Sequence, residues 1–159
     1  MTAGPHIDRA TPADADAVLA LIERAHLPTD GLAAHLDAAF VARDGDRVVG
    51  SVAIEIYADG GLLRSLAVDA DCRGGGLGGR LTEAAIEDTQ RRGLPALYLL
   101  TTTAEGFFPR FGFERIERDD VPASLHASIE FRGACPANAV VMRKPLPELS
   151  ARLQSSRTR

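Results

Sequence analysis

Residues 72–80 of this chain are Cys72-Arg73-Gly74-Gly75-Gly76-Leu77-Gly78-Gly79-Arg80. An apolar run, 62–68, precedes this loop and predicts a buried strand, and the segment 81–92 after it predicts a helix. A strand, a glycine turn and a helix N-terminus can bind phosphate, because glycines let backbone N–H groups approach an anion and the helix dipole favours negative charge. Arg73 and Arg80 add positive side chains. We therefore predict a ligand that carries a pyrophosphate.

Three other interpretations of the loop are weaker. The dinucleotide fingerprint fits as Gly74-x-Gly76-x-x-Gly79, but it needs an acidic residue roughly 20 positions further on, where the chain has only Leu-Tyr-Leu-Leu. A P-loop needs Lys and Ser or Thr where this chain has Arg80 and Leu81. A flexible linker without a ligand would not need an apolar strand before it and a patterned helix behind it.

The composition of the chain indicates which class of protein it belongs to and which binding partners it does not favour. The chain has 159 residues, 45% hydrophobic and 25% charged, and its net charge of −4 favours neither nucleic acid nor membrane as a partner. We predict one domain over residues 1–146 and a flexible tail over 147–159. The two cysteines, Cys72 and Cys135, form no Cys-x-x-Cys motif, so we expect no metal site, no disulfide framework and a cytoplasmic location. The N-terminus lacks the pattern of a signal peptide.

Hydrophobic periodicity predicts a mixed α/β fold. The expected strands are 6–10, 40–43, 47–57, 62–68, 96–102, 113–118 and 139–146. The expected helices are 11–27, 31–40, 81–92 and 105–111. A helix that links the strands 62–68 and 96–102 makes these two strands parallel and adjacent.

The motif Arg73-x-x-Gly76-x-Gly78 resembles the coenzyme A pyrophosphate loop, Gln/Arg-x-x-Gly-x-Gly/Ala, of the GNAT superfamily of N-acyltransferases. The resemblance extends over 6–146. It implies the GNAT fold, a mixed and twisted sheet of about six or seven strands with helices on both faces, in which parallel strands splay at the cofactor site. Acetyl-CoA is the implied cofactor. Its implied contacts are Leu66, Ala67, Val68, Arg73, Gly74, Gly75, Gly76, Leu77, Gly78, Gly79 and Arg80.

Stretches further along the chain narrow the resemblance. The run 99–104 and the segment 131–139 are similar to N-acetyltransferases associated with arsenic resistance, and the first also resembles glutamate N-acetyltransferase domains. This implies acetyl transfer to the amine of a small molecule, such as an amino acid or a glutamate-like, phosphinic or arsinic compound, in detoxification or amino-acid metabolism. The oligomeric state stays open, with a homodimer among the alternatives.

Two residues are candidates for the catalytic chemistry. Glu55 is the candidate general base, acting through water, because burial in an apolar strand would bring its protonation nearer to neutral pH. The alternative is a Glu that is exposed or salt-bridged. Tyr57, in phase with Glu55, is a candidate substrate contact or general acid. Many family members use a Tyr at the position of Phe108 to protonate the leaving thiolate, so the general acid is left open here.

Three residues are predicted to bind the substrate. Arg64 interrupts a hydrophobic strand and needs an anionic partner, which is either a substrate carboxylate or a neighbouring acid such as Glu55. Thr101 and Arg132, the latter an alternative carboxylate clamp, complete the set. Among the histidines, His35 could line a pocket. Two other functions remain open: a catalytically weak domain that binds coenzyme A as a sensor or partner module, and N-acetylation of proteins.

Overall fold

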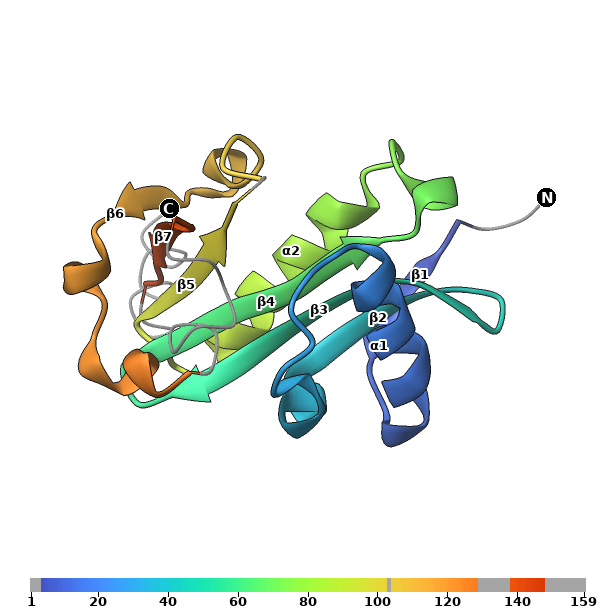
Figure 1. The fold of residues 1–159 in the computed structure, drawn as a ribbon, viewed down its shortest axis with the longest axis horizontal. Coiled ribbons are helices and arrows are strands. Elements are labelled where there is room, and N and C mark those ends of the chain that lie inside the picture. The colour runs from blue at the N-terminus through green and yellow to red at the C-terminus, as the bar shows by residue number, and fades with distance from the viewer. Residues whose placement is uncertain (1–3, 103, 129–137, 148–159) are drawn as a thin grey trace, which may run out of the picture. The chain divides into compact units, whose positions relative to one another are not determined.

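The computed structural model describes residues 4–102, 104–128 and 138–147. Seven strands in these residues form one sheet, in the order β1-β2-β3-β4-β5-β7-β6 (Figure 1). Their bounds are β1 His6–Arg9, β2 Ala39–Asp44, β3 Arg47–Tyr57, β4 Gly60–Val68, β5 Ala96–Thr101, β6 Glu114–Ile116 and β7 Val140–Pro145. The predicted mixed sheet with helices is confirmed, and each predicted strand is present with ends shifted by at most a few residues.

Two of the four predicted helices are α-helices. They are α1, Ala15–Arg24, and α2, Leu77–Arg91. The predicted helix 31–40 was wrong in type, because it is a 3₁₀ segment, η2, over Leu32–Ala38 with a non-helical backbone at His35. The predicted helix 105–111 shortens to a 3₁₀ turn, η4, over Phe108–Phe111, which ends at Gly112 with φ 92°. The remaining 3₁₀ turns are η1 Pro12–Asp14, η3 Ala70–Cys72, η5 Arg118–Asp120 and η6 Ala123–Ala127.

The structure divides into two compact units, and each has its own core. The first unit comprises Met1–Glu55 and Leu63–Ala85, and the second comprises Ile56–Leu62 and Ile86–Arg159. In the second unit, β5 pairs antiparallel with β7, and β7 pairs with β6. The buried cluster there consists of Leu62, Ala96, Tyr98, Val121, Leu125 and Val141. No helix among the described residues is both long enough and apolar enough to span a bilayer.

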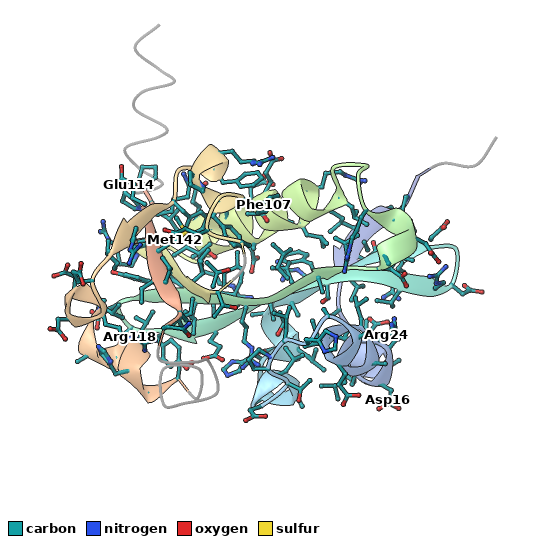
Figure 2. All side chains as sticks on the ribbon, turned by 45° about the horizontal axis from the view of Figure 1, so that its top comes forward. Asp16, Arg24, Phe107, Glu114, Arg118 and Met142 are labelled. Atoms are coloured by element: carbon teal, nitrogen blue, oxygen red, sulfur yellow. The ribbon has the colours of Figure 1, made fainter. Side chains whose placement is uncertain are left out.

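In the first unit, helices cover both faces of strands β2 to β4. The apolar stripe of α1 packs against strand residues in a cluster of Val18, Leu21, Ile22, Leu32, Ala39, Val41, Ala53 and Ala67. On the other face a Cβ built at Gly50 would lie 2.9 Å from Leu81 Cδ1 of α2, so glycine allows the helix to pack closely. Figure 2 shows α1 and the start of α2 on opposite sides of the strands. This packing fixes where β4 ends and where α2 begins.

Asp14, at the start of α1, belongs to a partly buried ion pair with Arg43. Its carboxylate accepts hydrogen bonds from Arg43 Nη1 and Nη2, both at 2.8 Å, and from the backbone N–H of Thr11 at 2.7 Å. Asp14 is only 5% exposed. The hydrogen bonds from Arg43 outweigh burial and lower the pKa of Asp14 from 3.8 to about 2.

We expect Asp14→Asn to destabilise the protein by about 2 kcal/mol at pH 7. Because the folded-state pKa lies below the unfolded value, the contribution of Asp14 is present above pH 3.8 and disappears as the pH falls toward 2. Urea unfolding of the wild type and of Asp14→Asn between pH 7 and pH 3 should therefore show a difference in the free energy of unfolding that becomes smaller at low pH. Asp8→Asn is the control, since Asp8 bonds the same Arg43 at 3.3 Å but its side chain is 46% exposed. An equal loss in both variants would contradict the prediction.

Candidate functional site

The glycine loop joins the end of β4 to the start of α2, as predicted. Gly74 and Gly76 have φ values of +90° and +79°, a backbone conformation that other residues rarely adopt. No atom lies within 4 Å of a Cβ built at either position, so the backbone conformation, and not a lack of space, requires glycine there. Leu77 is buried and anchors the loop at its helical end. The remainder of the loop is exposed or half-buried, which leaves its backbone accessible.

Backbone N–H groups gather where α2 begins. Arg80 N–H donates to Gly76 O at 3.1 Å, a bond of the helical i to i−4 type. The N–H groups of 77–79 come before this bond, in the part of a helix where such groups have no carbonyl of the same helix to bind. The N-terminal dipole adds a partial positive charge there. The start of α2 therefore suits a phosphate or another anion.

Arg73 and Arg80 flank this helix start, and both are exposed. Arg73 Nε donates to Val68 O at 3.3 Å, which holds the side chain near the end of β4. Arg80 Nη1 donates to Pro5 O at 2.9 Å, which connects α2 to the segment before β1. Each guanidinium has further donors beyond the one used in these bonds, so a phosphate contact needs no rupture of either.

The residues before the loop form an irregular part of β4. Ser65 has φ 57°, an unusual value for a residue in a strand. Its carbonyl accepts a hydrogen bond from the buried Ser51 hydroxyl at 2.8 Å. Three residues predicted to contact the cofactor follow directly: Leu66 and Val68 are half-buried, and Ala67 is 7% exposed. The strand thus leaves regular geometry just before the segment that leads into the glycine loop.

Glu55 and Arg64 form a buried ion pair on neighbouring strands β3 and β4. Arg64 Nη1 lies 2.7 Å from Glu55 Oε2, and the two side chains are 0% and 1% exposed. Arg64 also donates from Nη2 to Pro28 O at 3.1 Å and from Nε to Ser65 Oγ at 3.2 Å. Of the two partners considered for Arg64, the geometry favours the neighbouring acid. Binding of a substrate carboxylate by Arg64 would require this pair to open.

His35 lies beside Glu55 and is more exposed to solvent than either member of the pair. Its Nε2 is 3.9 Å from Glu55 Oε2, which is within the range of an ion pair but beyond that of a hydrogen bond. The His35 side chain is 28% exposed, whereas that of Glu55 is almost completely enclosed. The sequence indicates His35 only as a residue that could line a pocket. No motif signals its contact with Glu55, which lies 20 positions away.

The other predicted residues lie in the second unit or outside the described residues. Thr101, at the end of β5, accepts a hydrogen bond from Ala104 N–H at its hydroxyl oxygen. Tyr57 is half-buried and packs against the core cluster of the second unit. Phe108 is 4% exposed, with its ring centroid 5.1 Å from that of Phe107 and 5.6 Å from that of Phe113. Arg132 and Cys135 lie outside the described residues.

Comparison with protein families matches residues 35–115 to the acetyltransferase (GNAT) domain. This range covers half of the chain and includes β3, β4, the glycine loop and α2. The chain belongs to the GNAT acetyltransferase family. The motif that suggested the resemblance, Arg73-x-x-Gly76-x-Gly78, lies inside the matched range.

One relative in sequence and two solved structures are similar to this chain. An uncharacterised N-acetyltransferase from Chlorobaculum tepidum is 34% identical over 92 residues, which are 57% of this chain and 59% of that protein. N-acetylglutamate synthase from Neisseria gonorrhoeae, solved with coenzyme A and N-acetyl-glutamate, superposes with a TM-score of 0.78 at 23% identity and covers 93% of this chain. Only 36% of the synthase chain is matched. Rv2747 from Mycobacterium tuberculosis, solved with CoA and NLQ, gives 0.75 at 24% identity, over 90% of this chain and 100% of that one.

Proposed function

We propose that this GNAT protein is an acetyl-CoA-dependent N-acetyltransferase that acts on the amine of a small molecule. The observation that carries the proposal is the loop 73–79, whose positive-φ glycines lead directly into the N-terminus of α2. Membership in the acetyltransferase family supports the same chemistry. This chain spans 59% of the Chlorobaculum tepidum relative and 36% of the synthase.

The residues of the loop fit the diphosphate of coenzyme A. The N–H groups at the start of α2 would bind it, and the exposed guanidiniums of Arg73 and Arg80 would add charge. Leu66, Ala67 and Val68 would contact the pantetheine arm through backbone groups, as an added strand does. When bound, acetyl-CoA supplies an acyl group on a good leaving thiol. The chain itself must supply a proton acceptor for the amine and must hold the amine in place.

We propose an amino acid or a glutamate-like compound as the substrate, with phosphinic and arsinic analogues included. The fold shared with a synthase solved with N-acetyl-glutamate, and the similarity of 99–104 to glutamate N-acetyltransferase domains, support this choice. Arg64 is engaged with Glu55, so we propose Arg132 as the carboxylate clamp. Thr101 and Tyr57 remain proposed substrate contacts, and a role in detoxification or amino-acid metabolism, in the cytoplasm, depends on the substrate.

A screen of amines tests the proposed activity. The purified protein is incubated with acetyl-CoA and glutamate, glutamine, phosphinothricin, arsinothricin or spermidine, and products are read by mass spectrometry and by release of thiol. We expect a mass increase of one acetyl group on an amino-acid substrate and little on the polyamine. Acetylation of the polyamine alone would contradict the proposed substrate class.

The buried Phe108 favours a second function, a domain that binds coenzyme A without efficient turnover. A Phe has no proton to give a leaving thiolate, and this one is enclosed by aromatic rings. Calorimetry with coenzyme A beside the amine screen separates the two functions. Binding with turnover supports the enzyme, and binding without turnover on any amine supports the sensor.

A further inference from the structure

The side chains of Arg64, Glu55 and His35 differ in their exposure to solvent, and this difference suggests which of them exchanges protons with water. Arg64 is innermost, with a side chain that is 0% exposed, and Glu55 at 1% is enclosed between it and His35. His35, 28% exposed, is the member of the three that solvent reaches. A group that takes protons from successive substrates must return them to water, and the enclosed carboxylate has no such access in this arrangement.

We infer that His35 accepts the proton of the substrate ammonium, and that Glu55 is a positioning residue rather than the base itself. This inference rests on the proposed acetyltransferase function. Nε2 is the ring nitrogen nearest to Glu55 Oε2, so the carboxylate favours the tautomer with hydrogen on Nε2. Nδ1 then carries the lone pair that accepts a proton. Arg64 Nη1 donates to Glu55 Oε2 at 2.7 Å and holds the carboxylate in a fixed orientation.

The charges around His35 suit this role. When Nδ1 takes a proton, the imidazolium lies 3.9 Å from the Glu55 carboxylate, which stabilises it. The elements α1 and β2 also pack on η2, but Arg24 of α1 lies near Asp69 and Arg43 of β2 binds Asp14. Asp37, on η2 itself, is exposed. Among the described residues, Glu55 is therefore the charged group that lies within ion-pair distance of His35.

The proton step is balanced without any further reactant. One N–H bond of the substrate ammonium breaks, its electron pair stays on nitrogen, and an N–H bond forms at His35 Nδ1. The amine is then neutral and can act as a nucleophile. The imidazolium gives its proton to water before the next cycle, which restores the starting state.

The first test compares His35→Asn with His26→Asn on the best substrate from the amine screen. We expect His35→Asn to lower kcat by about 100-fold at pH 7 while the Kd for coenzyme A stays unchanged. The deficit should shrink as the pH rises toward 9, because more of the amine is then already neutral. His26 is a matched control, since it is exposed and has φ 59°, a conformation that Asn tolerates. A deficit below about threefold, or one that does not change with pH, would overturn the inference.

A second test does not depend on turnover. Nitrogen-15 spectra of the histidine rings report the tautomer of each ring. We expect hydrogen on Nε2 of His35 in the wild type, and a loss of this preference in Glu55→Gln, with His126 as an internal reference. An unchanged tautomer in Glu55→Gln would overturn the inference. If no amine is acetylated but this coupling is present, the proposed function fails while the coupling between His35 and Glu55 stands.

Discussion

We expect Gly78→Asp to lower the affinity for coenzyme A by about 10³-fold while the protein remains folded. Gly78 lies in the first turn of α2, where a carboxylate is favourable for the helix itself because it complements the dipole. The same carboxylate would repel a diphosphate bound at the helix start. One like charge at about 4 Å costs about 4 kcal/mol at an intermediate dielectric, which corresponds to a loss of about 10³-fold in affinity. Isothermal titration calorimetry with coenzyme A measures this loss.

The variant Gly78→Asn distinguishes the effect of negative charge on coenzyme A affinity from the effect of side-chain size. The two side chains have nearly the same size, so a steric effect would lower affinity equally in both variants. We expect Asn to weaken binding far less than Asp, and we expect the midpoint of urea unfolding of Gly78→Asp to equal or exceed that of the wild type. Gly76 is less suitable for this test, because its φ of +79° would strain any side chain. Equal affinity of wild type and Gly78→Asp would refute the placement of the diphosphate.

Arg64→Met causes the largest loss of stability that we predict, about 3–5 kcal/mol. The substitution removes the guanidinium that lies 2.7 Å from a carboxylate with 1% exposure, and it also removes the hydrogen bond to Pro28 O. Glu55 is then left buried without its main partner of opposite charge. Urea unfolding at pH 7 measures the loss, and circular dichroism shows whether the variant is folded at the start of the titration.

The double variant Glu55→Leu with Arg64→Met tests whether the loss comes from the unpaired charge. Replacement of a buried ion pair by apolar residues of similar volume is often neutral, so the double variant should regain most of the stability that Arg64→Met loses. The two single substitutions should therefore be strongly non-additive. A double variant that is as unstable as the sum of the single variants would show that Arg64 acts through packing and its backbone contact instead.

Local patterns in the sequence were sufficient to predict most strands of the sheet and the position of the glycine loop. Alternation over 47–57 between an Asp-Gly turn and a second turn defines β3, and its bounds agree with those of the structure. Segment 31–40 was assigned to a helix because Leu32 and Leu36 have helical spacing. The structure has a 3₁₀ segment instead, with a non-helical His35 and with β2 beginning at Ala39. Apolar spacing indicates which residues face the core, but it does not determine the type of a short helix.

The site was less predictable because its contacts join distant parts of the chain. A buried Arg in a strand requires an anion, but the sequence left open whether Arg64 faces Glu55 or a substrate. Register between β3 and β4 decides this question, and side-chain alternation alone does not give the register. The position of His35 beside Glu55 depends on how η2 folds against the strands, and no motif reports it. The glycine loop was easier to predict, because its glycines are needed for local backbone geometry.

Backbone amide spectra of nitrogen-15-labelled protein, titrated with coenzyme A and separately with pantetheine, test the central claim most directly. The N–H groups of 74–79 should show the largest shifts with coenzyme A, and these shifts should be absent with pantetheine, which has no diphosphate. Coenzyme A binding that leaves the amides of 74–79 unshifted, or that shifts them as much with pantetheine, would contradict the claim that the start of α2 binds the diphosphate.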